Sequence, residues 1–413
     1  MTKEAVAVNV EVAIEVKPLG KSLIGNRPFP ELGIVELKRI LGTTIKHDDT
    51  NKIVTFACLL SAYTETAQFN ILFIAPSGSG KSYVAIEVAA FFPEVDVKDF
   101  GHCSPTSFFH DVGIYDETKK ATIVDLSRKI LIFLDQPQTD LLARLRPLLS
   151  HDKKSISNKI TDKDKSAGHR AKNIILKGFP AVVFCTANFS VDEQEATRCF
   201  ILSPEVSQSK IEAALKEKLK KESDSKAYRK ELEADSQRAA LKERILAIKN
   251  ENIDDVRIQN VARLEEGFHE TVKLLRPGAP REMGRLMSLV KMFALLNLWC
   301  REREGKTVIA NDRDIENGLT IWKEVALSQE LNISPHMLMI YQKVMAPLLQ
   351  AHDGKVRSHQ VITQHKEIFQ YALNERELWT SVIPSLAGAC LIDTDKDPDD
   401  KRRSIIVRGA REI

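Results

Sequence analysis

The chain has 413 residues, which is enough for two or three domains. Hydrophobic residues make up 43% and charged residues 28%, so there is ample material for a globular core. The formal net charge of +3 excludes a globally basic nucleic-acid binder, and any basic surface must be local.

The sequence favours a cytoplasmic protein. No run approaches ~18 uncharged apolar residues, so no membrane span is expected, and acidic residues interrupt the apolar N-terminal stretch, unlike a signal peptide. The cysteines show no CxxC spacing and no accompanying His cluster, which argues against a metal site built from them. Four of the six lie in apolar runs, as buried reduced thiols do; the six are Cys58, Cys103, Cys185, Cys199, Cys300 and Cys390.

The first half of the chain predicts a nucleotide-binding unit. Residues 1–46 form an N-terminal arm, whose weak alternation predicts a short strand before a helix over 30–41. A second helix is expected over 51–65. A short β-type run over 70–74 is followed by a glycine-rich loop and a helical pattern over 83–92. Strand, glycine loop and helix in this order are what a phosphate-binding loop requires.

Two further apolar runs predict buried strands, over 129–134 and 181–186. Continuous apolar strands separated by helical patterns indicate a parallel sheet with helices on both faces. We therefore assign residues 47–205 to an α/β ATPase core.

The second half predicts three helical units. Residues 206–254 are dense in Lys, Glu, Ala and Leu and predict one or two long helices. These helices form either a solvated surface arm or a coiled-coil arm that contacts a neighbouring subunit or DNA. Residues 255–330 predict a helical lid. Residues 331–413 predict helices, a polar stretch and two β-type runs around a charged turn, which describes a winged-helix domain.

The glycine-rich loop carries the strongest functional signal. Two glycines let the backbone turn its N–H groups inward, and the next helix points its positive end at a phosphate. Lys81 is expected to reach the β- and γ-phosphates of ATP, and the Ser82 hydroxyl to bind Mg²⁺. Ala75 stands where the usual pattern has Gly. The expected nucleotide-binding residues are Ala75, Pro76, Ser77, Gly78, Ser79, Gly80, Lys81, Ser82 and Tyr83.

Polar residues at the ends of the other two strands complete the expected catalytic site. Asp135 follows an apolar strand and can hold the Mg²⁺ shell. Gln136 stands where many ATPases carry a Glu that accepts the proton of the attacking water. Either the natural protein uses another base or hydrolyses slowly, or Gln136 replaces a Glu and traps ATP. Asn188 can position the lytic water, or it can merely cap a loop.

These segments together resemble AAA+ ATPases, and more narrowly the minichromosome-maintenance (MCM) helicase group. The resemblance rests on 69–82, on 101–127 with its turn at 116–120, and on 155–161 with 173–176. It covers about residues 50–300 and the C-terminal unit. The last two segments resemble the helix-2 insertion and the pre-sensor-1 hairpin of that group.

The resemblance implies further site residues and partners. Arg198 resembles the arginine finger that reaches a neighbour's ATP, and Arg281 resembles sensor 2, with Arg285 as the fallback. It implies a homo-oligomer, expected to be a hexameric ring, that contacts DNA. Expected DNA contacts are Lys119 and Lys120 in the first insertion, Lys159, Lys163, Lys165 and Arg170 in the hairpin, and Lys401, Arg402 and Arg403 in the wing.

The sequence departs from the MCM pattern in three ways. Only some 50 residues precede the ATPase, zinc-ligand spacing is missing, and Gln136 replaces the acid. We expect a ring-forming ATPase that couples ATP turnover to DNA translocation or unwinding. The rival interpretation is an ATP-gated assembly, loader or defence switch with little hydrolysis. A protein-remodelling ATPase would need an aromatic residue in its pore loop, but the nearest candidates, Phe108 and Phe109, lie in the segment that resembles the helix-2 insertion. No aromatic stacking platform for DNA is expected.

Overall fold

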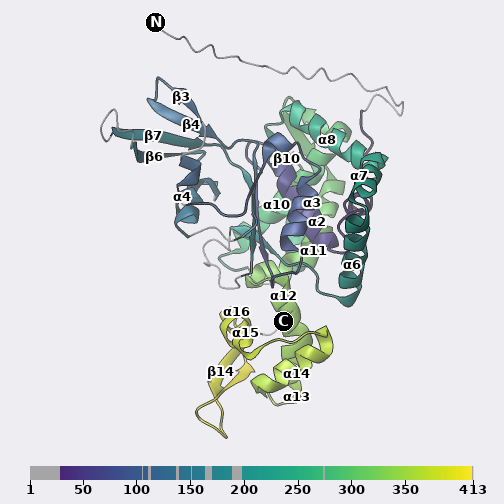
Figure 1. Ribbon diagram of the computed structural model, residues 1–413, viewed down its shortest axis with the longest axis vertical. Coiled ribbons are helices and arrows are strands. Elements are labelled where there is room, and N and C mark those ends of the chain that lie inside the picture. The colour runs from purple at the N-terminus through teal and green to yellow at the C-terminus, as the bar shows by residue number, and fades with distance from the viewer. Residues whose placement is uncertain are drawn as a thin grey trace.

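The computed structural model describes residues 28–104, 106–109, 113–135, 139–149, 151–162, 170–187, 198–272, 275–411 and 413. For residues 109, 139, 160–162, 170 and 171 it describes the backbone alone. The predicted strand within the N-terminal arm lies outside the described residues. Figure 1 shows a central α/β body, a sheet that projects from one side of it, and a separate C-terminal unit.

The central sheet has five parallel strands in the order β2-β5-β8-β1-β9. Residues of β1, β5, β8 and β9 are all buried, which is why their sequences are apolar apart from Asn70 and Thr186 at strand ends. The predicted parallel sheet is confirmed. The strands are β1 (Asn70–Ile74), β2 (Val97–Phe100), β5 (Ile130–Phe133), β8 (Ala181–Thr186) and β9 (Cys199–Leu202).

Helices cover both faces of this sheet, as predicted. Alternate residues along each strand enter different cores. Ile71 and Phe73 of β1 pack into the core that contains α2 (Asp49–Ser61) and α3 (Lys81–Ala89), and Leu72 and Ile74 pack into the core that contains α4 (Thr139–Leu149). Helix α1 (Ile34–Leu41) lies against α2.

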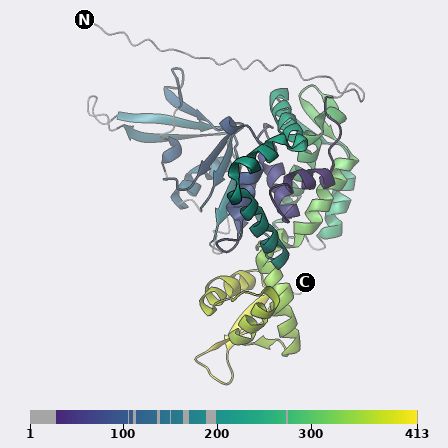
Figure 2. The same ribbon diagram turned by 45° about the vertical axis from the view of Figure 1, so that its right-hand side comes forward.

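A second sheet has four strands in the order β3-β4-β7-β6. The segment over 101–127 and the hairpin over 155–176 were predicted as two separate insertions, but parallel pairing of β4 with β7 joins them in one sheet. This sheet projects from the body in Figures 1 and 2. Its strands are β3 (Ile114–Asp116), β4 (Ala121–Asp125), β6 (Ser155–Asp162) and β7 (Arg170–Lys177).

The charged arm consists of three helices, so the prediction of one or two was wrong. They are α6 (Gln208–Ser223), α7 (Ser225–Ala234) and α8 (Ser236–Glu251). Asp224 and Asp235 break the run because their carboxylates accept hydrogen bonds from the first backbone N–H groups of the next helix. Helix α8 is not a solvated arm, since its Leu241, Ile245 and Ile248 are buried in the main core.

The predicted lid contains three helices and a small sheet that the sequence analysis missed. Its helices are α9 (Val261–Thr271), α10 (Ala279–Leu296) and α11 (Asp312–Leu331). The sheet has the order β10-β12-β11, from Asp255–Ile258, Thr307–Ala310 and Glu302–Glu304. Arg301 anchors the start of α11: its side chain is 1% exposed and donates to both carboxylate oxygens of Asp314 at 2.7 and 2.8 Å.

The C-terminal unit has its own hydrophobic core of helices and a three-stranded antiparallel sheet, β13-β15-β14. The two predicted strands are present. The polar stretch between the predicted helices is instead partly helical, because Val361, His365 and Phe369 line one face of α14 (Ser358–Phe369). The other elements are α12 (Pro335–Ile340), η4 (Tyr341–Met345), α13 (Ala346–Ala351), β13 (Lys355–Val356), α15 (Glu375–Glu377), η5 (Leu378–Val382), α16 (Ile383–Gly388), β14 (Ile392–Lys396) and β15 (Ser404–Arg408).

The cysteines and the apolar segments agree with the sequence analysis. Cys58, Cys103, Cys185 and Cys199 are buried free thiols, whereas Cys390 is exposed. Among the described residues, none of the helices is both long enough and apolar enough to span a membrane.

The C-terminal unit should lose stability in mild acid. Burial lowers the pKa of His336 from 6.5 to about 4, so the unfolded chain binds a proton that the folded unit excludes. This stability is present above pH 6.5 and is lost as the pH falls towards 4, by about 2 kcal/mol near pH 4.5. His336→Gln should flatten the fall of melting temperature over this window, and exposed His359→Gln should not. If the melting temperatures of both variants fell equally with pH, His336 would not be the group that destabilises the unit in acid.

Candidate nucleotide-binding site

The glycine-rich loop lies at the carboxyl end of β1 and leads directly into α3. Gly78 and Gly80 have φ angles of +80° and +96°, in the left-handed region that favours glycine. Helix α3 begins at Lys81, so its free N–H groups and the positive end of its dipole face the loop. A loop of this form offers a preformed site for an anion.

Lys81 lies folded back into the loop. Its Nζ donates to the carbonyl oxygens of Ala75 at 2.7 Å and Pro76 at 2.9 Å. Burial lowers the pKa of Lys81, and the neighbouring Cys185 and Asp135 partly oppose this effect. Both acceptors are neutral backbone carbonyls. These two hydrogen bonds therefore hold the ammonium group in place but do not neutralise its charge.

Ser82 and Asp135 meet across the ends of β1 and β5. The Ser82 hydroxyl donates to the carbonyl oxygen of Leu134 at 3.4 Å, next to Asp135. Cys185, at the end of β8, hydrogen-bonds with Ser82; burial raises its pKa to about 11, although that hydrogen bond and Lys81 act in the other direction. The chain thus brings Lys81, Ser82 and Asp135 together, as the sequence predicts.

The donor set at this edge fits Mg²⁺. A hydroxyl and a carboxylate are hard oxygen ligands, and Mg²⁺ bound with phosphates usually keeps several waters and takes few protein ligands. Within the described residues there is no group of three or more His, Cys, Asp or Glu side chains that could form a complete metal cage. Ser82 and Asp135 would therefore hold the ion only together with the phosphates.

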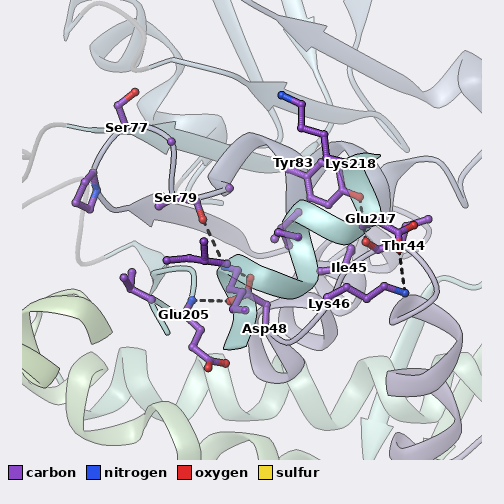
Figure 3. A pocket seen from close by; sticks show the side chains of 18 of the residues that line it. Thr44, Ile45, Lys46, Asp48, Ser77, Ser79, Tyr83, Glu205, Glu217 and Lys218 are labelled. Atoms are coloured by element: carbon purple, nitrogen blue, oxygen red, sulfur yellow. Dashed lines mark hydrogen bonds and ion pairs between the residues drawn. The ribbon is translucent and has the colours of Figure 1, made fainter. Parts of the chain in front are cut away.

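A cavity of about 670 Å³ opens beside the loop. Figure 3 shows it between the loop residues Ser77 and Ser79, the segment Thr44–Lys46 and helix α6. Tyr83 crosses one end, where its hydroxyl donates to the carbonyl oxygen of Thr44 at 3.0 Å and burial raises its pKa. Most of the lining surface is apolar, but charged side chains contribute as well. The apolar residues away from the loop are Ile45, Tyr83, Val84, Val206, Ile211 and Ala214, and the charged ones are Lys46, Asp48, Glu205, Lys210, Glu217, Lys218, Lys221 and Glu222.

Helix α6 forms one wall of the cavity. Figure 2 shows the teal arm lying across the front of the core. Three ion pairs fasten the helix there: Lys210 to Asp48, Lys46 to Glu217 at 3.3 Å, and Lys221 to Glu87 at 3.6 Å. The sequence analysis assigned no role in the nucleotide site to this helix, because its charged composition is typical of any solvated arm.

The remaining predicted catalytic residues are only partly placed. Gln136 and Asn188 lie outside the described residues. Arg198 is half-buried just before β9, and Arg281 is exposed in the first turns of α10. Arg285, the fallback, is a core residue: it donates to Gln329 at 3.3 Å, lies 5.9 Å from the ring of Phe200, and burial lowers its pKa to about 10. It does not suit a phosphate contact.

The predicted DNA-contacting residues fall on the projecting sheet and the C-terminal turn. Lys119, Lys120 and Lys159 are exposed on the four-stranded sheet. Lys163 and Lys165 lie outside the described residues, and for Arg170 only the backbone, paired with Asp162, is described. Lys401, Arg402 and Arg403 are exposed between β14 and β15, where Asp400 pairs with Arg402 at 3.1 Å and Arg403 at 3.5 Å.

The structure exposes an aromatic residue that the sequence analysis passed over. Tyr115 is 60% exposed and its neighbour Ile114 is 82% exposed, both on the edge strand β3. The lysines of the adjoining turn, Lys119 and Lys120, follow at once. An exposed aromatic ring is the kind of side chain on which a base can stack, so Tyr115 is a candidate that the expectation of no stacking platform did not take into account.

No model of a known protein family matches this sequence, and no curated protein matches it either. A function for the chain has to come from the chemistry of its own residues. The loop at β1, the carboxylate at β5 and the cavity beside them are the features that such an inference starts from.

Proposed function

We propose that this chain is an ATPase of the AAA+ type that acts on DNA as a homo-oligomeric, hexameric ring. The observation that carries the proposal is the meeting of Lys81, Ser82 and Asp135 at one edge of a parallel sheet, beside a cavity of about 670 Å³. Ligand sites in the crevice at the carboxyl ends of strands are the rule in open α/β sheets, and this volume suits a small ligand.

The two ends of the cavity suit the two ends of a nucleotide. Loop residues 76–80 line one end, where their N–H groups favour phosphates, and Lys81 follows this loop at the start of α3. The apolar side chains of Ile45, Tyr83 and Ile211 favour a planar base. Mg²⁺ held by Ser82 and Asp135 would neutralise charge that develops on the phosphates. In this proposal Asn188, two residues after the end of β8 in the sequence, would orient the attacking water.

Arginines would complete the site within the ring. Arg198 would reach the ATP of a neighbouring subunit, and Arg281 would act from the lid of its own subunit. Arginine suits both roles because it stays charged and presents a planar fork of donors to phosphate oxygens. Arg281 is exposed near the start of α10.

The projecting four-stranded sheet is the best candidate for DNA contact. It carries exposed Tyr115, Lys119 and Lys120 on β3 and the turn after it, and exposed Lys159 on β6 at the opposite edge. The sheet thus has side chains suited to base stacking and to phosphate neutralisation. The C-terminal unit, which we propose to be a winged helix, is the weaker candidate. Between Ile392 and Ser404 it holds five Asp against four Lys and Arg, and Asp400 pairs with two of those cations.

Removing the ring of Tyr115 should weaken single-stranded DNA binding. Stacking on one aromatic side chain contributes about 1–3 kcal/mol, so Tyr115→Ala should raise the dissociation constant by roughly 5- to 100-fold. Tyr115→Phe keeps the ring and should bind almost normally. Fluorescence anisotropy with a labelled oligonucleotide at fixed salt measures both. Equal binding by the Ala and Phe variants would argue against stacking.

The rival function is an ATP-gated assembly, loader or defence switch that needs little hydrolysis. Gln136 favours it, because an amide can orient a water but cannot accept its proton. In that case ATP would still bind at Lys81 and Ser82 and would drive oligomerisation. DNA would then be held without being moved.

DNA-stimulated ATP hydrolysis at low salt tests the proposal. The chain should be compared with Gln136→Glu, with Lys81→Ala as the blank. If the Glu variant hydrolyses ATP faster on DNA, the motor function stands. If neither responds to DNA while ATP still drives assembly in gel filtration, the switch function takes its place.

A further inference from the structure

Lys210, on α6, extends into the mouth of the phosphate loop. Its Nζ forms an ion pair with Asp48 and lies 3.4 Å from the carbonyl oxygen of Ser79. A Cβ atom placed on Gly80 would lie 4.0 Å from the same nitrogen. The side chain is only 11% exposed, so a charged amine is held close to the loop that is expected to bind phosphate.

Asp48 is fixed by the core and does not depend on α6 for its position. It is buried, and its Oδ1 accepts hydrogen bonds from Asn51 Nδ2 at 2.9 Å and from the backbone N–H of Glu205 at 2.6 Å. Figure 3 shows Asp48 on the floor of the cavity, near Glu205 and across from Ser79. The carboxylate is therefore a stationary partner, whereas the long side chain of Lys210 can turn.

We propose that Lys210 is a second phosphate-binding lysine, supplied by the helical arm and held by Asp48 until a nucleotide binds. The inference rests on the proposed nucleotide site. A polyphosphate carries several negative charges against the single charge of Asp48, and Nζ already lies 3.4 Å from the loop carbonyl of Ser79, so a phosphate bound at the loop would be within reach of Lys210. The ligand class is nucleoside di- and triphosphates, and a nucleoside without phosphate gains nothing from Lys210.

Position and pairing single out Lys210 from the other lysines of the cavity wall. The Nζ of Lys46 donates to the carbonyl oxygens of Gly42 at 3.2 Å and Thr43 at 2.7 Å, away from the loop. Lys218 pairs with Glu222 on its own helix, and its side chain is 69% exposed. Lys221 pairs with Glu87 at 3.6 Å. Of these four lining lysines, Lys210 is the one that donates to the loop backbone.

Nucleotide binding to Lys210→Met tests this role. Titration calorimetry should show ATP and ADP bound roughly 10-fold more weakly and adenosine bound as in the unchanged chain. Lys216→Met, on the exposed side of the same helix, is the matched control and should bind all three normally. Lys210→Arg keeps the charge and should restore most of the affinity for ATP.

The outcomes separate this inference from the proposed function. If the unchanged chain does not bind ATP, the nucleotide site itself fails. Suppose that the unchanged chain binds ATP, that Lys81→Ala binds it more weakly and that Lys210→Met binds it normally. The phosphate role of Lys210 is then contradicted, while the nucleotide site is supported. Equal losses for ATP and adenosine would mean that Lys210 only supports the cavity wall, which also overturns the inference.

Asp48→Asn is an independent test should Lys210→Met fold poorly. The amide oxygen can still accept from Glu205 N–H, but it no longer holds the ammonium by charge. ATP binding should tighten by a few fold while adenosine binding stays the same. Unchanged or weaker ATP binding in a folded Asp48→Asn protein would count against a phosphate role for Lys210.

Discussion

Lys81→Ala is expected to weaken ATP binding by about 10- to 100-fold. The ammonium group would form charged hydrogen bonds with the β- and γ-phosphates, and such bonds contribute about 1.5–3 kcal/mol each. In the structure its partners are the carbonyl oxygens of Ala75 and Pro76, which the phosphates can replace when the side chain extends. Titration calorimetry with ATP and Mg²⁺ measures the loss.

The fold should survive this substitution. Lys81 holds loop carbonyls, not core groups, so the melting temperature without nucleotide should stay within a few degrees of the unchanged chain. Added ATP should raise the melting temperature of the unchanged chain more than that of Lys81→Ala at the same ATP concentration. If ATP shifted the melting temperatures of the two proteins equally, Lys81 would not contact ATP, and the loop would not be the binding site.

The elements predicted most closely are those whose residues are compatible with only one kind of secondary structure. The strand over 70–74 was placed correctly because five consecutive buried residues leave no polar face. The runs over 129–134 and 181–186 likewise became β5 and β8. The loop followed from its glycines, since two left-handed backbone positions between strand and helix need a residue without a side chain.

Short strands and interrupted helices were harder to predict. The strands β10, β11 and β12 have only three or four residues each, too few for periodicity to stand out from neighbouring helices. In the charged arm, Asp224 and Asp235 act as helix caps, but in the sequence they look like two more charges.

The contacts of the site itself lie beyond sequence reasoning wherever they join distant segments. Asp48 and Lys210 meet only because the core places the start of α2 beside the start of α6. Tyr115 was missed for a different reason. In the sequence it belongs to a β-type segment and suggests burial, but β3 is the edge strand of a projecting sheet, and its side chain is left exposed.

Gln136→Glu is expected to raise the rate of ATP hydrolysis by about 100- to 10,000-fold, the usual range for a general base. The carboxylate would take the proton of the attacking water next to Asp135, whereas the amide can only orient that water. Phosphate release at saturating ATP measures the rate. ATP affinity should change little or fall slightly, because a second negative charge would lie near the γ-phosphate.

Gln138→Glu is the matched control for this substitution. It adds the same charge two residues further along the chain, beyond the position that follows Asp135. If both variants accelerate hydrolysis equally, the effect is one of charge and not of proton transfer. If neither does, while Lys81→Ala still weakens ATP binding, position 136 is not the base. ATP binding, and not its hydrolysis, would then switch the protein between its states. Helix α6 and its Lys210, which lie at the loop, would respond to the bound nucleotide.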